Sequence, residues 1–322
     1  MKILSIGEVL WDIFDNGREF MGGAPLNVSA HIRQLGHTVA LFSAVGKDSR
    51  GNETLERISA LGLSTDLVQT VPGQSTGTAI VRTDANGNPV FSISRPAAFD
   101  FLSFGQETLS RLQDFAPDWI YFGTLAQTES RNEKILNRIV EYFPNAKRFY
   151  DINLRDGHWN LDLVSRLSYL ATTLKMNQSE AEILSRRTFG NRPFYLNEFC
   201  DYWSSTYGSE VICVTLGGNG CAVYSEGRLS TFSGFSVEVV DTVGSGDAFS
   251  AAFLHGTAMK WPIEERAAFA NALGALVASR PGATPLWTLA ECRQLMESPS
   301  NTSGMSIQSI FDLHAEPRRE QE

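Results

Sequence analysis

The sequence predicts an α/β protein with a mostly parallel central sheet, helices on both faces of that sheet, and a small second β-sheet. Three observations lead to this prediction. Short apolar runs typical of strands alternate with amphipathic helical stretches over most of the 322 residues. Such alternation is typical of parallel strands joined by helices that cover both faces. A hairpin between residues 73 and 100 interrupts the alternation, and the last stretch, 297–322, is polar and charged.

The first half of the chain alternates strand and helix in order. Its predicted helices are amphipathic, and glycine follows the first of them directly. The predicted strands are Lys2–Ile6, Thr38–Val45, Trp119–Phe122 and Arg148–Ile152. The predicted helices are Leu26–Leu35, Ser49–Leu61 and Arg131–Phe143.

The second half continues the pattern. Its predicted strands are Thr173–Met176, Val211–Thr215, Cys221–Tyr224 and Phe235–Val240. Its predicted helices are Ser179–Arg186, 247–258 and 264–279. We therefore expect one large α/β domain over residues 1–296, followed by a polar C-terminal tail, 297–322.

The interruption predicts a lid on this domain. Gly77–Thr83 and Val90–Ser94 have the residues of two strands, and Asn86-Gly87-Asn88 between them is typical of a tight hairpin turn. The segment Trp11–Phe20 is able to add a strand to this hairpin. A small sheet built from about 11–20 and 73–100 is suited to close over a substrate that must be shielded from water.

Composition excludes several classes of function. The chain has 27 Lys+Arg against 36 Asp+Glu, a formal charge of −9, whereas nucleic acids and anionic membranes require a basic surplus. No apolar run approaches the roughly 18 residues of a membrane span, and we expect no signal peptide. The four cysteines follow no disulfide or zinc-site spacing: Cys200, Cys213, Cys221 and Cys292. We expect a cytoplasmic protein with reduced thiols.

The most informative segment is Asp241–Asp247, between a predicted strand and a helix of small residues. Its glycines, Gly244 and Gly246, expose backbone N–H groups at the positive end of a helix, which favours an anion. Asp247 in the same turn would repel a passively bound phosphate. This favours a carboxylate, ionised at neutral pH, that takes a proton from an attacking hydroxyl while the amides hold the transferring group. The alternative is a glycine turn in which Asp247 caps the helix.

Two further segments each have two interpretations. Gly22–Asn27 contains glycines that permit close approach to a ligand, and Asn27 is able to bond sugar hydroxyls; the alternative is a tight turn before a helix. Asn177 with Glu180 three residues later matches a capping box, which the spacing alone favours. The functional alternative directs Glu180 toward a hydrated magnesium ion near phosphates.

Two more segments follow predicted strands. Thr215–Gly220 contains three glycines and fits either a hairpin turn or a loop that approaches nucleotide phosphates. Asp151–Arg155 lies at the carboxyl end of a strand, where open α/β sheets bind ligands. Arg155 pairs there with an anion or, alternatively, forms a surface ion pair. The third glycine of a dinucleotide fingerprint is missing, and no P-loop sequence occurs.

Together these segments resemble the ribokinase-like (PfkB) family of carbohydrate kinases, over about residues 2–296. Asp241–Asp247 is similar to the second signature of that family, and Gly22–Asn27 is similar to its first signature. Asn177 and Glu180 lie between the two signatures, in the order that the family has. The resemblance implies a ribokinase-like fold with a β lid and an ATP-dependent sugar kinase that uses Mg²⁺.

The resemblance also implies a role for each matching residue. By it, Asp247 is the catalytic base, and the amides of Gly244, Ser245 and Gly246 form an anion hole for the γ-phosphate. The residues implied in sugar binding are Asp12, Gly22, Gly23, Asn27, Arg95, Asn153 and Arg155. Those implied at the nucleotide are Asn177, Glu180, Thr215, Gly217, Gly218, Gly220 and Asn271, with Glu180 acting on Mg²⁺ through water. A monovalent-cation site, for K⁺, is implied at Asp241, Val243 and Gly282.

Within the family the chain resembles fructokinases, through Gly7–Asp12, Gly22–Pro25, the Phe91 to Arg95 stretch and Asp151–Arg155. This implies that fructose is converted to fructose 6-phosphate. Alternatives are another PfkB sugar kinase (a 2-keto-3-deoxygluconate kinase or a ribokinase) or a catalytically silent sugar or nucleotide sensor. An intact Asp247 argues against the sensor, because a pure binder needs no base. The resemblance also allows a homodimer through the lid.

Overall fold

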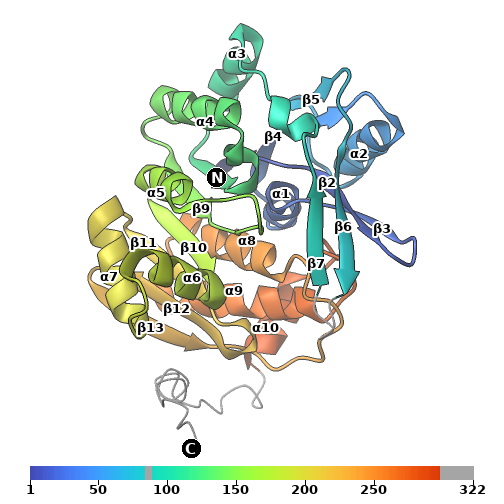
Figure 1. Ribbon diagram of the computed structural model, residues 1–322. Helices are drawn as coiled ribbons and strands as arrows, with labels where there is room; N and C mark the ends of the chain where they lie inside the picture. Colours follow the sequence, from blue (N-terminus) through green and yellow to red (C-terminus); the bar gives the residue numbers. More distant parts are fainter. Residues whose placement is uncertain (84–88, 298–322) are drawn as a thin grey trace, which may run out of the picture.

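The computed structural model describes residues 1–83 and 89–297, and in these ranges a nine-stranded sheet forms the centre of the molecule (Figure 1). Among these strands, the pairs β11–β12 and β12–β13 are antiparallel, and the other neighbouring pairs are parallel. From edge to edge the strands are β13 (Arg228–Ser233), β12 (Gly220–Ser225), β11 (Val211–Thr215), β10 (Thr173–Asn177), β9 (Lys147–Asp151), β8 (Trp119–Gly123), β1 (Lys2–Ile6), β4 (Thr38–Gly46) and β5 (Val68–Val71). The predicted mostly parallel sheet is confirmed.

Alternating side chains of the central strands belong to two separate hydrophobic cores. In β1, Ile3 packs in one core and Leu4 in the other; in β8, Tyr121 and Phe122 divide in the same way. Successive side chains of a strand point to opposite faces, so a strand covered on both faces needs apolar residues at nearly every position. This explains why the predicted strands are continuous apolar runs.

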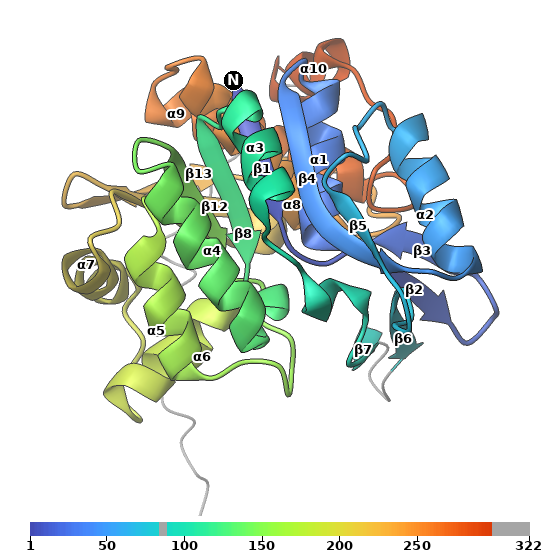
Figure 2. The same cartoon turned by 90° about the horizontal axis from the view of Figure 1, so that it is seen from above.

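Helices cover both faces of the sheet, as predicted (Figure 2). One core is closed by α3 (Gln106–Phe115), α4 (Ser130–Tyr142), α5 (Leu161–Leu170), α6 (Gln178–Phe189) and α7 (Leu196–Tyr207). The other is closed by α1 (Ala24–Gln34), α2 (Ser49–Ala60), α8 (Ser245–Ala258), α9 (Ile263–Ala278) and α10 (Leu289–Glu297). Short 3-10 turns are η1 (Ala98–Phe101), η2 (Leu125–Thr128) and η3 (Gly217–Asn219).

A second sheet of four strands stands beside the central one, where the sequence predicted a lid. Its order is β3 (Glu19–Gly22), β2 (Leu10–Phe14), β6 (Gly77–Thr83) and β7 (Pro89–Ser94). The predicted hairpin of β6 and β7 is confirmed, whereas its predicted turn, Asn86-Gly87-Asn88, lies outside the described residues. The segment from Trp11 contributes β2 and β3 rather than one strand. Trp11 anchors β2, because its indole N–H donates to the Thr54 hydroxyl at 2.8 Å.

One predicted strand is wrong. Phe235–Val240 forms no strand, although its apolar residues alternate. Phe235, Val237 and Val239 line a cavity, and Val239 and Val240 remain 61% and 59% exposed. The alternation therefore reflects one side facing a cavity rather than one face of a sheet.

The parallel strands place their carboxyl ends at one edge of the central sheet. The ends of β1, β9, β10 and β11 meet there, and α8 begins at the same edge. All four cysteines are buried free thiols, as the sequence predicted. Within residues 1–83 and 89–297, no helix is both long enough and apolar enough to span a bilayer.

Candidate active site

Two cavities meet at the first turn of α8. One, of about 480 Å³, is lined by Phe249 and Asn271 and is called here the apolar cavity. The other, of about 390 Å³, is lined by Glu8, Asp12 and Asp247 and is called the acidic cavity. The residues that line both cavities are Thr215, Gly217, Thr242, Ser245 and Gly246. A phosphate chain that runs through this junction would connect a ligand in one cavity to a ligand in the other.

The start of α8 depends on a glycine. Gly244 precedes the helix with a φ of 79°, in the left-handed region, and a Cβ there would lie 2.4 Å from the Ala283 carbonyl oxygen. The first N–H groups of a helix have no acceptor within the helix. Three N–H groups here were predicted to form an anion hole. One of them, that of Ser245, donates to the Thr242 carbonyl oxygen at 3.2 Å. The backbone of Gly246, in the first turn of α8, lies at the junction of the two cavities.

Asp247 is held by a residue from the other signature. The Asn27 side-chain amide donates to the Asp247 carboxylate at 2.8 Å, across 220 residues of sequence. The Asn27 amide oxygen is buried and has no protein partner, so it remains for a ligand hydroxyl. Burial raises the pKa of Asp247 to about 6, and the Asp151 carboxylate adds to the rise. The sequence had predicted instead that the helix start would favour the ionised form. The group is still mainly ionised at pH 7.

A buried lysine beneath this turn was not found by the sequence analysis. Lys175, on β10, places its Nζ 3.1 Å from both carboxylate oxygens of Asp151, at the end of β9. Asp151 also accepts bonds from the Tyr121 and Ser250 hydroxyls. A lysine inside an otherwise apolar strand was the available signal, because a buried ammonium requires a partner.

The acidic cavity contains a second carboxyl that the sequence analysis did not select. Glu8 is 4% exposed, and its Oε2 has no protein partner. Burial raises the pKa of Glu8 to about 7, with Asp247 adding to the rise. Asp12, which was predicted, lines the same cavity, and burial raises its pKa to about 6. Glu8 follows the end of β1, so the strand-end rule that selected Asp151–Arg155 was its signal.

Most of the predicted sugar-binding residues come together in the acidic cavity. Gly23 lines it with a φ of 110°, and a Cβ there would lie 2.5 Å from the Glu8 carbonyl oxygen. Asn153, whose φ is 44°, and Arg155 also line this cavity. Gly22 does not line the cavity; a Cβ at Gly22 would lie 3.3 Å from the Asp12 carboxylate.

Arg95 is placed differently from the prediction. Its guanidinium forms an ion pair with Asp100 and donates to the Leu125 carbonyl at 3.1 Å and to the Thr128 hydroxyl. It does not line the acidic cavity. The ion pair with Asp100 instead ties the end of β7 to η1, beneath the small sheet.

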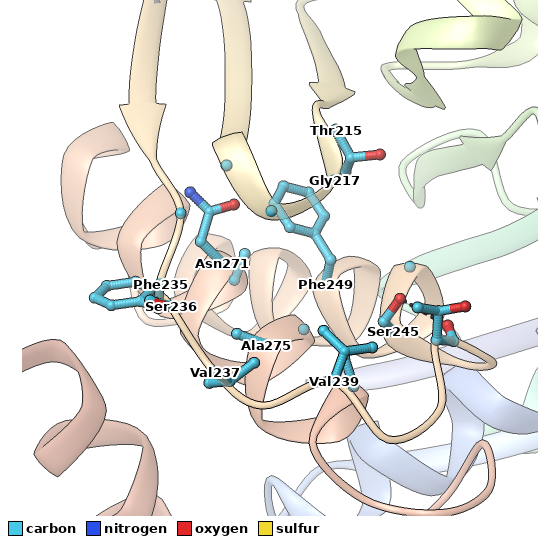
Figure 3. Close-up of a pocket in the computed structure, with 18 of the residues that line it drawn as sticks. Thr215, Gly217, Phe235, Ser236, Val237, Val239, Ser245, Phe249, Asn271 and Ala275 are labelled. Atoms are coloured by element: carbon cyan, nitrogen blue, oxygen red, sulfur yellow. Dashed lines mark hydrogen bonds between the residues drawn. The ribbon is translucent and has the colours of Figure 1, made fainter. Parts of the chain in front are cut away.

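The apolar cavity gathers the predicted nucleotide loop (Figure 3). Beta carbons at Gly217 and Gly218 would meet nothing within 4 Å, so the backbone of η3 is open to a ligand. Gly220 has another reason to be glycine, because a Cβ there would lie 2.1 Å from the Phe232 carbonyl oxygen. Figure 3 shows the Phe249 ring pointing toward the loop at Gly217. The η3 turn is thus both the hairpin turn and a cavity wall.

Asn271 has a structural contact as well as a place in the apolar cavity. Its side-chain amide donates to the carbonyls of Phe232 and Ser233, at 3.3 and 3.1 Å. These bonds fix α9 against the end of β13. The amide is therefore oriented before any ligand binds.

Asn177 and Glu180 form the capping box that their spacing predicted. The Asn177 side chain accepts from the Glu180 N–H at 2.9 Å, and the Glu180 carboxylate accepts from the Asn177 N–H at 2.8 Å. The other Glu180 oxygen accepts from the Leu154 N–H at 2.7 Å. Asn177 lines the acidic cavity, whereas Glu180 is buried behind it.

The three residues predicted for a monovalent-cation site lie together. The Asp241 carboxylate accepts from the backbone N–H groups of Val243 and Gly282, each at 3.0 Å. These bonds tie the loop that precedes α8 to the loop that follows α9. Within the described chain, no cluster of three His, Cys, Asp or Glu side chains is arranged to hold a metal ion alone.

Similar proteins of known name include fructokinases. Fructokinase-1 of Oryza sativa subsp. japonica is 28% identical over 296 residues, which cover 86% of this chain and 88% of the relative. The fructokinase of Escherichia coli is 27% identical over 315 residues, which cover 92% of this chain and 98% of the relative. Both relatives thus match along nearly their whole length.

Solved structures with the same fold include sugar kinases of two kinds. A fructokinase from Xylella fastidiosa with bound ATP has a TM-score of 0.81 at 22% identity, and one from Vibrio cholerae O395 with fructose, ADP and potassium ion has 0.77 at 22%. A 2-dehydro-3-deoxygluconokinase from Thermotoga maritima has a TM-score of 0.79 at 18% identity. Each match covers 92% of this chain and 98% of the other. The predicted ribokinase-like fold is confirmed.

A sequence profile described as pfkB family carbohydrate kinase matches residues 12–289. The match includes Asn27 and Asp247, which come from the two signature-like segments and bond to each other in the structure. The resemblance noted in the sequence is therefore confirmed, and the chain belongs to the PfkB family of carbohydrate kinases.

Proposed function

We propose that this protein transfers the γ-phosphoryl group of ATP to the terminal hydroxyl of fructose, giving fructose 6-phosphate. Membership of the PfkB family makes it a carbohydrate kinase, and the proposal adds its substrates and the residues that act on them. The observation that carries the proposal is the 2.8 Å hydrogen bond from Asn27 to Asp247 at the junction of two cavities. A carboxylate held there faces both a sugar site and a phosphate path.

The chemistry follows from that placement. Asp247 accepts the proton of the sugar hydroxyl as the hydroxyl oxygen attacks the γ-phosphorus and the bond to ADP breaks. The backbone N–H groups at the start of α8, around Gly246, stabilise the charge on the transferring group. The pKa of Asp247, raised by burial to about 6, suits a general base near neutral pH.

The apolar cavity is the proposed site of the nucleoside. Its volume of about 480 Å³ suits a nucleoside, and Phe249, Val237 and Ala275 supply apolar contacts for an adenine. The open backbone at Gly217 and Gly218 accommodates the phosphates, which reach the junction from there.

Magnesium is proposed to act with ATP beside Asn177 and Glu180. Both oxygens of the Glu180 carboxylate accept backbone N–H bonds, so this motif fits an ion that keeps its waters and is held mainly by phosphates. The ion would supply charge neutralisation for the β- and γ-phosphates. Glu180 would orient its water shell from behind Asn177.

A potassium ion is proposed beside Asp241, which links the loop before α8 to the loop after α9. The Asp241 carboxylate and the carbonyls of the two loops that it joins provide oxygen donors, which suit a hard cation. The ion would add positive charge beneath the loop that leads to Gly244. Replacing K⁺ by Li⁺ at constant ionic strength is expected to lower kcat.

Fructose is favoured over other sugars by the two relatives reported above, both of which are named fructokinases. The carboxyls of Glu8 and Asp12 suit the hydroxyls of a neutral sugar, and an ionised Asp12 would repel an acidic one. The second candidate is 2-keto-3-deoxygluconate, because Arg155 lines the same cavity and a guanidinium matches a carboxylate.

The experiment that tests the proposal measures ADP formation with MgATP and fructose, ribose, 2-keto-3-deoxygluconate or adenosine. Fructose is expected to give the highest kcat/KM, with NMR placing the new phosphate on the terminal carbon. A preference for 2-keto-3-deoxygluconate would keep the kinase and reject fructose. A protein that binds ATP but forms no ADP with any sugar would be a sensor.

The small sheet is proposed to act as a lid. Leu10 and Asp12 of β2, Ala79 of β6 and Ile93 of β7 line the acidic cavity, so one face of this sheet covers the sugar site. Closure would exclude water that otherwise hydrolyses ATP. The other face is proposed to support a homodimer, which light scattering of the whole chain would test.

A further inference from the structure

A buried ion pair lies where the proposed reaction would occur. Lys175 is 7% exposed, lines the acidic cavity, and has its Nζ 3.1 Å from each oxygen of Asp151. Removing two charges from water offsets most of their attraction, so a buried pair contributes little net stability. Stability therefore does not account for a lysine at this position, and its surroundings indicate another role.

Asp151 is held from several directions. Besides Lys175, it accepts a bond from the Ser250 hydroxyl of α8 at 3.0 Å and one from the Tyr121 hydroxyl of β8 at 3.2 Å. Lys175, Ser250 and Tyr121 are all buried. Because these bonds hold the Asp151 carboxylate in place, the carboxylate in turn holds the Lys175 ammonium in place.

The ammonium of Lys175 lies at the junction of the two cavities. A Cβ added to Gly246 would lie 3.0 Å from Lys175 Nζ, so the nitrogen packs directly against the backbone of that glycine. Gly246 lines both cavities. An ammonium has three N–H bonds, and the two Asp151 oxygens require two of them, which leaves one for a ligand at the junction.

The charge of Lys175 is maintained despite its burial. Burial lowers its pKa, but the carboxylates of Asp151, Glu180 and Asp247 outweigh burial, and the net shift is upward. The side chain is therefore an ammonium at neutral pH.

We propose that Lys175 is a catalytic residue that donates a hydrogen bond to the transferring phosphoryl group, and that Asp151 is the positioning residue of its ammonium. The inference rests on the proposed kinase function. In the step, the sugar oxygen bonds to phosphorus, the bond to ADP breaks, and the hydroxyl proton passes to Asp247. Lys175 keeps its protons and stabilises the charge on the phosphoryl oxygens.

The first test compares two nucleotides, because a contact with the γ-phosphate affects only one of them. Lys175→Met alone leaves the Asp151 carboxylate buried and uncompensated, so the working variant is Lys175→Met/Asp151→Asn, which is neutral. Calorimetry would measure its binding of MgADP and of a magnesium-loaded β,γ-methylene ATP analogue. We expect roughly 10-fold weaker binding of the analogue, as for one lost charge-assisted bond, and ADP binding within about 2-fold of the parent.

The second test measures turnover in the same double variant with the best sugar. We expect a kcat at least about 10²-fold below the parent, the loss typical of removing one donor to a transition-state oxyanion. The matched control is Lys147→Met, an exposed lysine on β9 that pairs with Glu210 at the surface, and its kcat should equal that of the parent.

The outcomes separate this inference from the proposed function. Parental kcat in the double variant would mean that Lys175 only neutralises Asp151, and would overturn the inference. Equal weakening of ADP and analogue binding would also overturn it, because the γ-phosphate would then make no special contact. If the parent phosphorylates no sugar, the proposed function fails, while the nucleotide comparison still decides whether Lys175 contacts the γ-phosphate.

Discussion

The two cavities that meet at α8 are lined by different kinds of chemical group. The apolar cavity is formed by backbone and apolar side chains, with glycines at η3 and rings such as Phe249. The acidic cavity is lined by carboxyl groups whose pKa values are raised by burial, among them Glu8, Asp12 and Asp247. On the proposed function, one cavity would therefore select its ligand by shape, and the other would select and transform its ligand by charge.

This difference teaches where substitutions should have large effects. A wall of backbone and apolar groups responds to changes in volume, and each contact contributes a small free energy. A wall of buried carboxyls responds to the loss of one charge or one hydrogen bond, and each such group contributes more. Effects should therefore be larger and pH-dependent in the acidic cavity, and smaller and pH-independent in the apolar cavity.

The largest effect is expected for Asp247→Asn. The variant keeps the shape of the side chain and removes a negative charge beside the phosphates, so ATP should bind at least as well as to the parent. Turnover should fall by at least about 10²-fold, the lower range for a positioned general base. Steady-state kinetics with the best sugar would measure this, with the exposed Asp162→Asn of α5 as control. Near-parental turnover would overturn the assignment of Asp247 as the base; its side chain makes no capping hydrogen bond at the start of α8.

A smaller effect is expected for Asp12→Ala. A hydrogen bond from a sugar hydroxyl to a carboxylate contributes about 1.5–3 kcal/mol, so kcat/KM for the sugar should fall about 10- to 150-fold. The KM for ATP should change little, because Asp12 lines only the acidic cavity. Asp12→Asn separates the charge from the hydrogen bond. An unchanged sugar dependence in both variants would remove Asp12 from the site.

The third prediction concerns Asn27→Ala and pH. The pKa of Asp247 is raised to about 6, so the parent should lose activity as the pH falls through about 6, where the base takes up a proton. The Asn27 amide stabilises the ionised form. Its loss should move the acidic limb of the kcat profile upward by about one pH unit, the equivalent of about 1.4 kcal/mol. An unmoved limb would mean that Asn27 contacts only the sugar.

The apolar cavity should respond to volume. Ala275→Phe, on the cavity wall of α9, is expected to raise the KM for ATP about 10-fold by occupying space that the adenine needs. The sugar KM should stay within about 2-fold, and the effect should be the same at pH 6 and pH 8. Ala60→Phe at the exposed end of α2 is the matched control. A change confined to the sugar KM would reverse the assignment of the two cavities.

The last prediction concerns stability rather than rate. Burial raises the pKa of Glu8 from 4.5 to about 7, so the folded protein holds a proton that the unfolded chain releases. Folding stability from this group is therefore lost as the pH rises between these values, by as much as about 3 kcal/mol. Glu8→Gln should be more stable than the parent at pH 8, with a smaller difference at pH 5, in urea titrations. The control is Glu53→Gln at an exposed position of α2.

Local patterns predicted much of the fold and part of the site. The start of α8 was predictable because glycine and small residues follow an apolar segment, and the Asn177 capping box because its residues are three apart. The bond between Asn27 and Asp247 was not predictable, because it depends on how α1 packs on α8. Lys175 was missed because an isolated strand does not reveal that Asp151 lies beside it. Phe235–Val240 failed because alternation does not distinguish a cavity wall from a sheet.

The junction of the cavities has a consequence for inhibitors. Because Ser245 and Gly246 line both spaces, a single compound that joins an adenosine to a sugar analogue through a phosphate chain would occupy both at once. Once one end is seated, the other end binds at an effective concentration on the order of millimolar, so the affinities of the two halves reinforce each other. Only tethers that match the span of the junction would gain this advantage. The tether length that gives the highest affinity would therefore estimate the distance over which the phosphoryl group is transferred.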